Sequence, residues 1–269
     1  MTMAKYKKLN INDFGVFDDK NKKYNDGVFT LQLASWEEFY SVVKIFNNNT
    51  DYFWRGQKDE CPLLSSFDRY CSKNNNREET LKRIFNNLKC RLKDLNSNID
   101  SLKPNEIWAI GQHYGLKTPL LDWTESPYIA AYFAFYKNGE EQNDRVIYAL
   151  NRALKLLIKG KDRFVEFDLP NNNFDPRQNQ RLIKQKGKFT IALEGRDIKS
   201  VLSEFWKKTR NKNKYINEII LTEILIPDKS RDECLSALRA MNITHGVLFP
   251  DNAGAVEISK IDLSQKYDN

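Results

Sequence analysis

Histidine and cysteine are scarce in this sequence of 269 residues, which holds two histidines and four cysteines. No two cysteines stand in a C-x-x-C spacing, so a closed zinc site is not expected. The longest apolar run, 128–136, is far too short to cross a bilayer, and "MTMAKYKKLN" lacks the apolar core of a signal peptide. These absences predict a cytoplasmic protein without a metal site or a membrane anchor.

The charge balance is basic, with 43 Lys and Arg residues against 36 Asp and Glu residues and a net charge of +7. Such a balance favours contact with polyanions such as RNA or DNA without establishing it. The length is compatible with one large domain or two small ones, and we expect one main domain.

Apolar spacing predicts alternating helices and strands along most of the chain. Ser35 and Glu38 predict a capping box at the start of the first helix. Predicted helices cover 35–46, 77–95, 104–114, 126–136, 197–206 and 230–241, and predicted strands cover 51–57, 145–151, 188–194 and 218–227, with two short strands in 246–258. This order indicates an α+β fold, with a mixed central sheet and flanking helices.

The stretch "GQHYGLKTPLLDWTESPYIAAYFAFY", residues 111–136, gathers polar and aromatic side chains around an apolar run. It is either a well-satisfied turn inside a core or the wall of a binding site. Ser126 and Pro127 are typical of a helix start, because serine caps the first turn and proline suits the first helical position.

Four segments together resemble the FRG domain family: "FWRGQ" (53–57), "QHYGLKTPLLDWTESPYIAAYFA" (112–134), "RLIKQKGKFTI" (181–191) and "GVLFPDNAGAVEI" (246–258). Their shared order makes the resemblance specific. It implies an FRG domain over 30–262, preceded by a polar, basic arm (1–29) and followed by a short tail (263–269).

The order of these segments also resembles that of an ADP-ribosyltransferase fold, which implies NAD as a substrate. On this resemblance Arg55 would pair with the pyrophosphate, because a planar guanidinium matches phosphate oxygens in a forked geometry. The NAD-binding residues implied in this way are Arg55, Gln57, Tyr114, Asp122, Trp123, Thr124, Ser126, Tyr128 and Tyr132, which offer charge, aromatic faces and hydroxyls.

The third catalytic residue has several candidates, because no Glu-x-Glu stands in the late strands. Glu223, a single acid in an apolar strand, is our first choice beside Arg55, since a carboxylate would stabilise the positive charge that develops on the ribose. Gln185 is the rival candidate for this catalytic role. Glu218, Glu257 and Asp122 are further alternatives.

Purely structural roles stand beside these functional ones. Arg55 could form an ion pair with Asp122 and fix the sheet. His113 could be a satisfied core histidine, and Trp123 and Tyr132 could be core aromatics. Glu223 could face solvent on an edge strand.

We therefore expect an ADP-ribosyltransferase that modifies a macromolecule, with RNA or another nucleic acid as acceptor, serving as a toxin or anti-phage effector. The segment "KKTRNKNK" (207–214) and the basic helix 77–95 would hold phosphates near the site. A toxin of this kind implies an antitoxin partner. Two alternatives stay open: an NAD glycohydrolase, and a non-catalytic module that binds a nucleotide or RNA.

Overall fold

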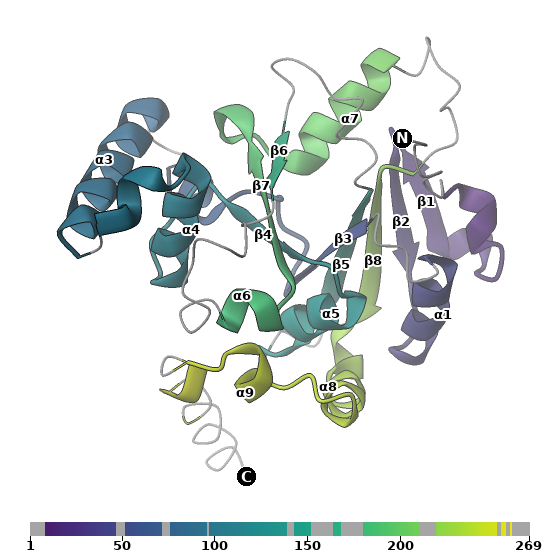
Figure 1. Cartoon of the computed structure of the whole chain (residues 1–269). Helices are drawn as coiled ribbons and strands as arrows, with labels where there is room; N and C mark the ends of the chain where they lie inside the picture. Colours follow the sequence, from purple (N-terminus) through teal and green to yellow (C-terminus); the bar gives the residue numbers. More distant parts are fainter. Residues whose placement is uncertain are drawn as a thin grey trace, which may run out of the picture.

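A computed structural model describes residues 9–46, 52–71, 76–95, 97–138, 143–151, 164–167, 180–209, 219–251, 254–256 and 259. An eight-stranded sheet runs through the molecule in the order β1-β2-β8-β5-β3-β4-β7-β6 (Figure 1). Its strands are β1 (Lys22–Asn25), β2 (Val28–Gln32), β3 (Tyr52–Gln57), β4 (Leu121–Thr124), β5 (Asp144–Asn151), β6 (Phe164–Phe167), β7 (Gly187–Ala192) and β8 (Leu221–Pro227). The pair β2 and β8 is parallel and the other neighbouring pairs are antiparallel, so the sheet is mixed, as predicted.

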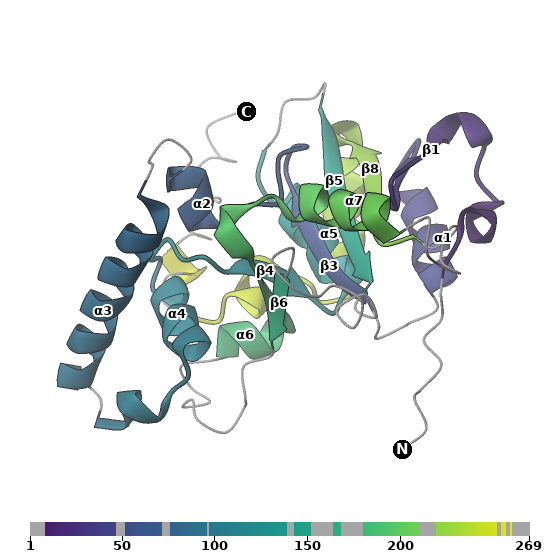
Figure 2. The same ribbon diagram turned by 90° about the horizontal axis from the view of Figure 1, so that it is seen from above.

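The helices pack on both faces of this sheet. They are α1 (Glu37–Phe46), α2 (Ser66–Cys71), α3 (Arg77–Leu95), α4 (Pro104–His113), α5 (Pro127–Phe135), α6 (Gln180–Lys184), α7 (Ile198–Thr209), α8 (Arg231–Ala240) and α9 (His245–Leu248). One core lies between the sheet and α1, α5 and α8, and a second lies under α7, which crosses the strands in Figure 2. A third cluster joins α3 and α4 to β7.

The sheet divides between β3 and β4. In the described residues these two strands are paired at a single position, Trp54 with Thr124, whereas β3 and β5 are paired over six positions. In the described residues the pairing of β3 with β4 does not extend beyond this position, so the backbone of Asp122 has no partner in β3. The division creates the room in which the candidate site forms.

The N-terminal boundary differs from the prediction. Residues 9–29 belong to the domain rather than to a separate arm, because Leu9 and Phe14 are buried in the first core and β1 and β2 join the sheet. The backbone confirms this attachment, since the amide of Ile219 donates to the carbonyl of Leu9 over 3.0 Å. Burial of two apolar side chains, Leu9 and Phe14, therefore holds this otherwise polar segment against the domain.

Two further predictions are corrected. Helix α1 begins at Glu37 and not after a Ser35 cap, because the Glu38 carboxylate accepts from the Ala34 amide over 2.8 Å. In the segment 246–258, predicted as two strands, residues His245–Leu248 are helical. Thr244 caps this helix, and its hydroxyl accepts from the Val247 amide. A hydroxyl at the N-cap outweighs the apolar composition that suggested strands.

Some predictions lie outside the described residues, including Glu218, Glu257, the tail 263–269 and residues 210–214 of the basic segment. Within the described part, none of the helices combines the length and apolar character that crossing a bilayer requires.

Candidate functional site

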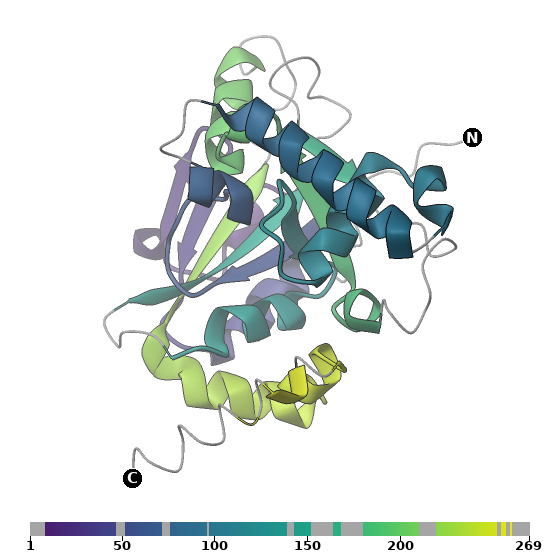
Figure 3. The ribbon, with the colours of Figure 1, turned by 90° about the vertical axis from the view of Figure 1, so that its left-hand side faces the viewer.

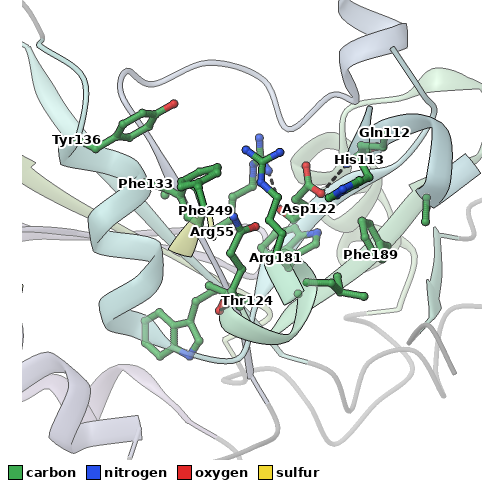
Figure 4. Close-up of a pocket in the computed structure, with 17 residues that line it drawn as sticks. Arg55, Gln112, His113, Asp122, Thr124, Phe133, Tyr136, Arg181, Phe189 and Phe249 are labelled. Carbon is green, nitrogen blue, oxygen red and sulfur yellow. Dashed lines mark hydrogen bonds between the residues drawn. The ribbon is translucent and has the colours of Figure 1, made fainter. Parts of the chain in front are cut away.

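A cavity of about 390 Å³ opens where β3 and β4 separate. Helices α4, α5 and α6 and the residue that follows α9 complete its walls (Figure 4). Its polar lining residues are Arg55, Gln112, His113, Asp122, Thr124, Arg181 and Gln185, and its aromatic ones are Trp54, Trp123, Phe133, Tyr136, Phe189 and Phe249. Most of a drug-sized ligand could be enclosed by a cavity of this size.

Gly56 brings α5 against β3 and so forms one wall. A Cβ atom at this position would lie 1.8 Å from the carbonyl oxygen of Ala130 and 2.6 Å from the amide nitrogen of Ala134. Only glycine allows this approach of helix backbone to strand. The small residues Ala130, Ala131 and Ala134 on α5 are fully buried there. In the Arg-Gly pair, Gly56 therefore allows α5 to pack directly on β3, and Arg55 places its guanidinium next to that contact.

Arg55 spans the gap between the two diverging strands. Its Nη1 atom donates to the main-chain carbonyl of Asp122 over 2.6 Å, and its Nε atom donates to Gln57 Oε1 over 3.1 Å. Gln57 is itself held, since its amide donates to the Cys61 carbonyl over 2.9 Å. Desolvation lowers the pKa of Arg55, and the nearby Asp122 opposes this shift. The side chain is thus fixed in orientation while it lines the cavity.

The Asp122 carboxylate is oriented from α4. Gln112 Nε2 donates to its Oδ1 atom over 2.5 Å, and the Thr118 hydroxyl donates to the Gln112 side-chain oxygen. Asp122 is exposed to solvent through the cavity, although protein atoms surround its carboxylate closely enough to desolvate it in part. This desolvation raises the pKa of its carboxyl, and the charges of Arg55 and Arg181 act in the opposite direction. The cavity thus contains a carboxylate of fixed orientation near two cations, Arg55 and Arg181.

The end of α4 explains how Gln112 and His113 reach the cavity. Gly115 adopts φ +86°, and its amide and that of Leu116 bond back to the carbonyls of Gln112 and Gly111 over 2.9 Å each. This is a Schellman motif, which closes the helix with a left-handed residue. It leaves Gln112 and His113 in the last turn facing the cavity and sends the chain outward.

Arg181 on α6 supplies the second guanidinium. Its Cζ atom lies 4.2 Å from the centre of the Phe249 ring, which stacks in turn on His245 at 4.3 Å. In the part of the chain that the structure describes, no acidic side chain pairs with Arg181. Burial and then the positive charge of Arg181 lower the pKa of His113, which favours the neutral form of its imidazole.

Five of the predicted site residues meet at this cavity: Arg55, Asp122, Trp123, Thr124 and Gln185. The polar atoms of the last three are already engaged. The Trp123 indole donates to Thr190, the Thr124 hydroxyl donates to the Gln185 carbonyl over 2.7 Å, and the Gln185 amide donates to the Leu248 carbonyl over 3.0 Å. They build the wall, whereas Arg55 and Asp122 present charge to the cavity. Gln57 lies behind Arg55.

Four other predicted binding residues do not line the cavity. Ser126 caps α5, as its hydroxyl accepts from the Ile129 amide over 3.3 Å. Tyr128 packs edge-on against Phe39, and the Tyr132 hydroxyl lies 3.0 Å from His245 Nδ1. Tyr114 is 72% exposed and points outward from the end of α4.

Glu223 also lies outside the cavity lining. It is 2% exposed in the central strand β8, not on an edge, and its carboxylate accepts from Lys199 Nζ over 2.6 Å and from the Thr30 hydroxyl over 3.0 Å. These two donors compensate the cost of burying the carboxylate, so its burial is no evidence that it faces a cleft. The carboxylate that the cavity presents belongs to Asp122.

Sequence reasoning gave no site role to Gln112, Arg181, Tyr136, Phe189 or Phe249. Arg181 and Gln185 stand four residues apart in "RLIKQ", a spacing that places both side chains on one face of a helix. This spacing is the feature of the sequence that could have assigned Arg181 to the site together with Gln185. Phe249 carries no comparable signal, because the composition of its segment predicts a strand.

A family model described as the FRG domain matches residues 50–143. The matched range holds β3 with its Arg-Gly pair, α4, β4 and α5, whereas Arg181, Gln185 and Phe249 lie beyond it. No curated protein and no solved structure matches the chain. This match confirms the resemblance to the FRG domain family over residues 50–143.

Proposed function

We propose that this protein is an NAD-dependent ADP-ribosyltransferase that modifies a macromolecule, with RNA as the preferred acceptor. The observation that carries the proposal is the pair of guanidiniums, Arg55 and Arg181, lining one cavity with the Asp122 carboxylate. Two cations suit a pyrophosphate, and a carboxylate suits a sugar that becomes positively charged.

The two arginines would divide the recognition of NAD. Arg55 is held rigidly by Gln57 and by the Asp122 carbonyl, so it would supply a fixed guanidinium edge to phosphate oxygens. Arg181 rests on the face of Phe249 and would pair with the same group from helix α6. Phe133 and Tyr136 offer rings for the nicotinamide or the adenine.

Asp122 would act on the bond that breaks. As the C–N bond to nicotinamide breaks, its electron pair moves to the ring nitrogen, which leaves as neutral nicotinamide. The ribose carbon gains positive charge, which the Asp122 carboxylate stabilises most strongly in the transition state. A lone pair of the acceptor then forms the new bond, and the neutral imidazole of His113 could take the acceptor's proton.

The test is direct. Purified protein is incubated with NAD labelled in the adenylate portion and with total RNA, DNA or lysate protein. Transfer of label to RNA supports the proposal, and transfer to none of the three overturns it. Asp122→Asn is the matched control, because it keeps the side-chain size and removes the charge.

A binding module is the second candidate. The observation that favours it is the bond from Gln112 to Asp122, since a carboxylate already fixed by an amide donor can serve to position a ligand without reacting. Calorimetry that detects NAD binding, with no release of nicotinamide in the presence or absence of an acceptor, would select this alternative.

A further inference from the structure

A second surface lies beside the cavity, formed by Arg69 and Tyr70 on α2 and by Tyr114 and Lys117 in the turn after α4. Tyr70 is 69% exposed and Tyr114 is 72% exposed, and both cationic side chains are exposed as well. We call these four residues the outer surface. Figure 3 views this side of the molecule, with α3 nearest the viewer and α2 beside its N-terminal end.

Hydrogen bonds hold the two parts of the outer surface together. The amide of Phe67 donates to the Thr118 carbonyl over 3.2 Å, and the amide of Thr118 donates to Ser66 Oγ over 3.2 Å. Helix α2 is therefore tied to the residue that follows Lys117. Across this junction Lys117 Nζ lies 4.3 Å from the centre of the Tyr70 ring. A cation and an aromatic face stand side by side, with both exposed to solvent.

The outer surface is continuous with the cavity. The rings of His113 and Tyr114 contact edge to face at 4.9 Å, and His113 lines the cavity. Thr118 bonds to Gln112, which lines it too. At the other end, Arg69 lies close enough to Arg55 for its positive charge to lower the pKa of that residue, after the larger effect of desolvation. A strand lying on the outer surface would lead to the two arginines.

We propose that the outer surface docks a segment of single-stranded RNA, with bases stacked on Tyr70 and Tyr114 and phosphates paired with Arg69 and Lys117. Exposed aromatic rings beside cations are what unpaired nucleotides require, because bases stack on the rings and phosphates bind the charges. RNA fits better than DNA, since loops and ends of cellular RNA offer unpaired bases and duplex DNA does not. The proposal rests on the proposed function, since it assigns the surface on which the acceptor of that reaction would lie.

The chain offers a matched control for this surface. On α1, Tyr40 is 59% exposed and Lys44 Nζ lies 5.2 Å from the centre of its ring. Tyr40 and Lys44 thus repeat the tyrosine–lysine pair of the outer surface at a place that does not border the cavity. The variants Y70A/K117A and Y40A/K44A each replace one tyrosine and one lysine by alanine.

The experiment measures anisotropy of a fluorescent 12-nucleotide RNA of unstructured sequence, titrated with the full chain in the absence of NAD. We expect Y70A/K117A and Tyr114→Ala each to raise the dissociation constant by about tenfold or more, as for loss of a stacked base. Y40A/K44A should bind like the unaltered protein. Thermal unfolding of each variant checks that its fold is retained.

Three results would overturn the docking surface. They are unaltered RNA binding by Y70A/K117A, an equal loss of binding in Y40A/K44A, and tighter binding of duplex or single-stranded DNA than of RNA. An NAD titration of the unaltered protein separates the two proposals. RNA binding without NAD binding would reject the proposed function and keep the surface, whereas NAD binding without RNA binding would reject the surface alone.

Discussion

Arg55 bonds the main-chain carbonyl of Asp122 and not its carboxylate, with Nη1 2.6 Å from the carbonyl oxygen. The structural role considered for Arg55, an ion pair with the Asp122 carboxylate, is therefore not what the structure has. Arg55 bonds to the backbone of Asp122, and Gln112 holds the carboxylate instead. This arrangement keeps both charges in the cavity without using one to neutralise the other at close contact. A ligand that brings a phosphate and a developing cation could then engage each of them.

Arg55→Lys should weaken NAD binding by about 2–4 kcal/mol, the range for loss of a charge-assisted pair. Lysine keeps the charge but cannot span Gln57 Oε1 and the Asp122 carbonyl with a single ammonium group. Calorimetric titration with NAD measures the effect. Lys58→Ala, which removes an exposed cation from the next loop, is the control. Equal affinity of Arg55→Lys and unaltered protein would exclude Arg55 as a phosphate ligand.

Asp122 and Glu223 should respond oppositely to the same loss of charge. Asp122→Asn should lower nicotinamide release by about two to three orders of magnitude and leave unfolding nearly unchanged. Glu223→Gln should lower the free energy of unfolding by about 1–3 kcal/mol, because its buried bond to Lys199 is weakened, and leave turnover nearly intact. Urea unfolding and a nicotinamide assay on both variants measure this contrast. A loss of turnover in Glu223→Gln with none in Asp122→Asn would return the catalytic role to Glu223.

The pH dependence of turnover should show an acid limb that belongs to Asp122. Its pKa is raised above 3.8 in the free protein, so kcat/KM should fall as the pH drops through that higher value and the carboxylate becomes protonated. His113→Gln separates the two titrating groups. The limb should persist in that variant and vanish in Asp122→Asn.

The strand-to-helix part of the site could be predicted from the sequence because its signals are local. The Arg-Gly pair ends a strand, and Ser126 and Pro127 begin a helix, as the structure confirms. The partners of a buried charge are not local. An acid in an apolar strand indicates burial for Glu223, but nothing near it in the sequence identifies Lys199 and Thr30 as its donors. The contact between Arg181 and Phe249 is not local either, because the two residues lie far apart in the sequence. Phe249 follows the short helix α9, which lies in a segment whose composition favours strands.

Gly56 and Gly115 should differ in how their replacement by alanine destabilises the fold. At Gly56 the added methyl would overlap the backbone of α5, with 1.8 Å to the Ala130 carbonyl oxygen, and backbone atoms cannot move aside as a flexible side chain can. We expect a loss of at least about 3 kcal/mol, at the upper end for overpacked cores. At Gly115 no atom lies within 4 Å of the added methyl, but φ is +86°. The left-handed backbone alone should cost about 1–2 kcal/mol.

Chemical denaturation of both variants measures the two losses, and a third variant isolates their causes. Gly115→Asn should recover part of the loss seen in Gly115→Ala, since asparagine tolerates the left-handed region, while Gly56→Asn should be at least as damaging as Gly56→Ala. Because α5 forms a wall of the cavity, Gly56→Ala should also weaken NAD binding, and Gly115→Ala should do so less. Equal stability of the two alanine variants would contradict the direct contact of α5 with β3, on which the position of Arg55 depends.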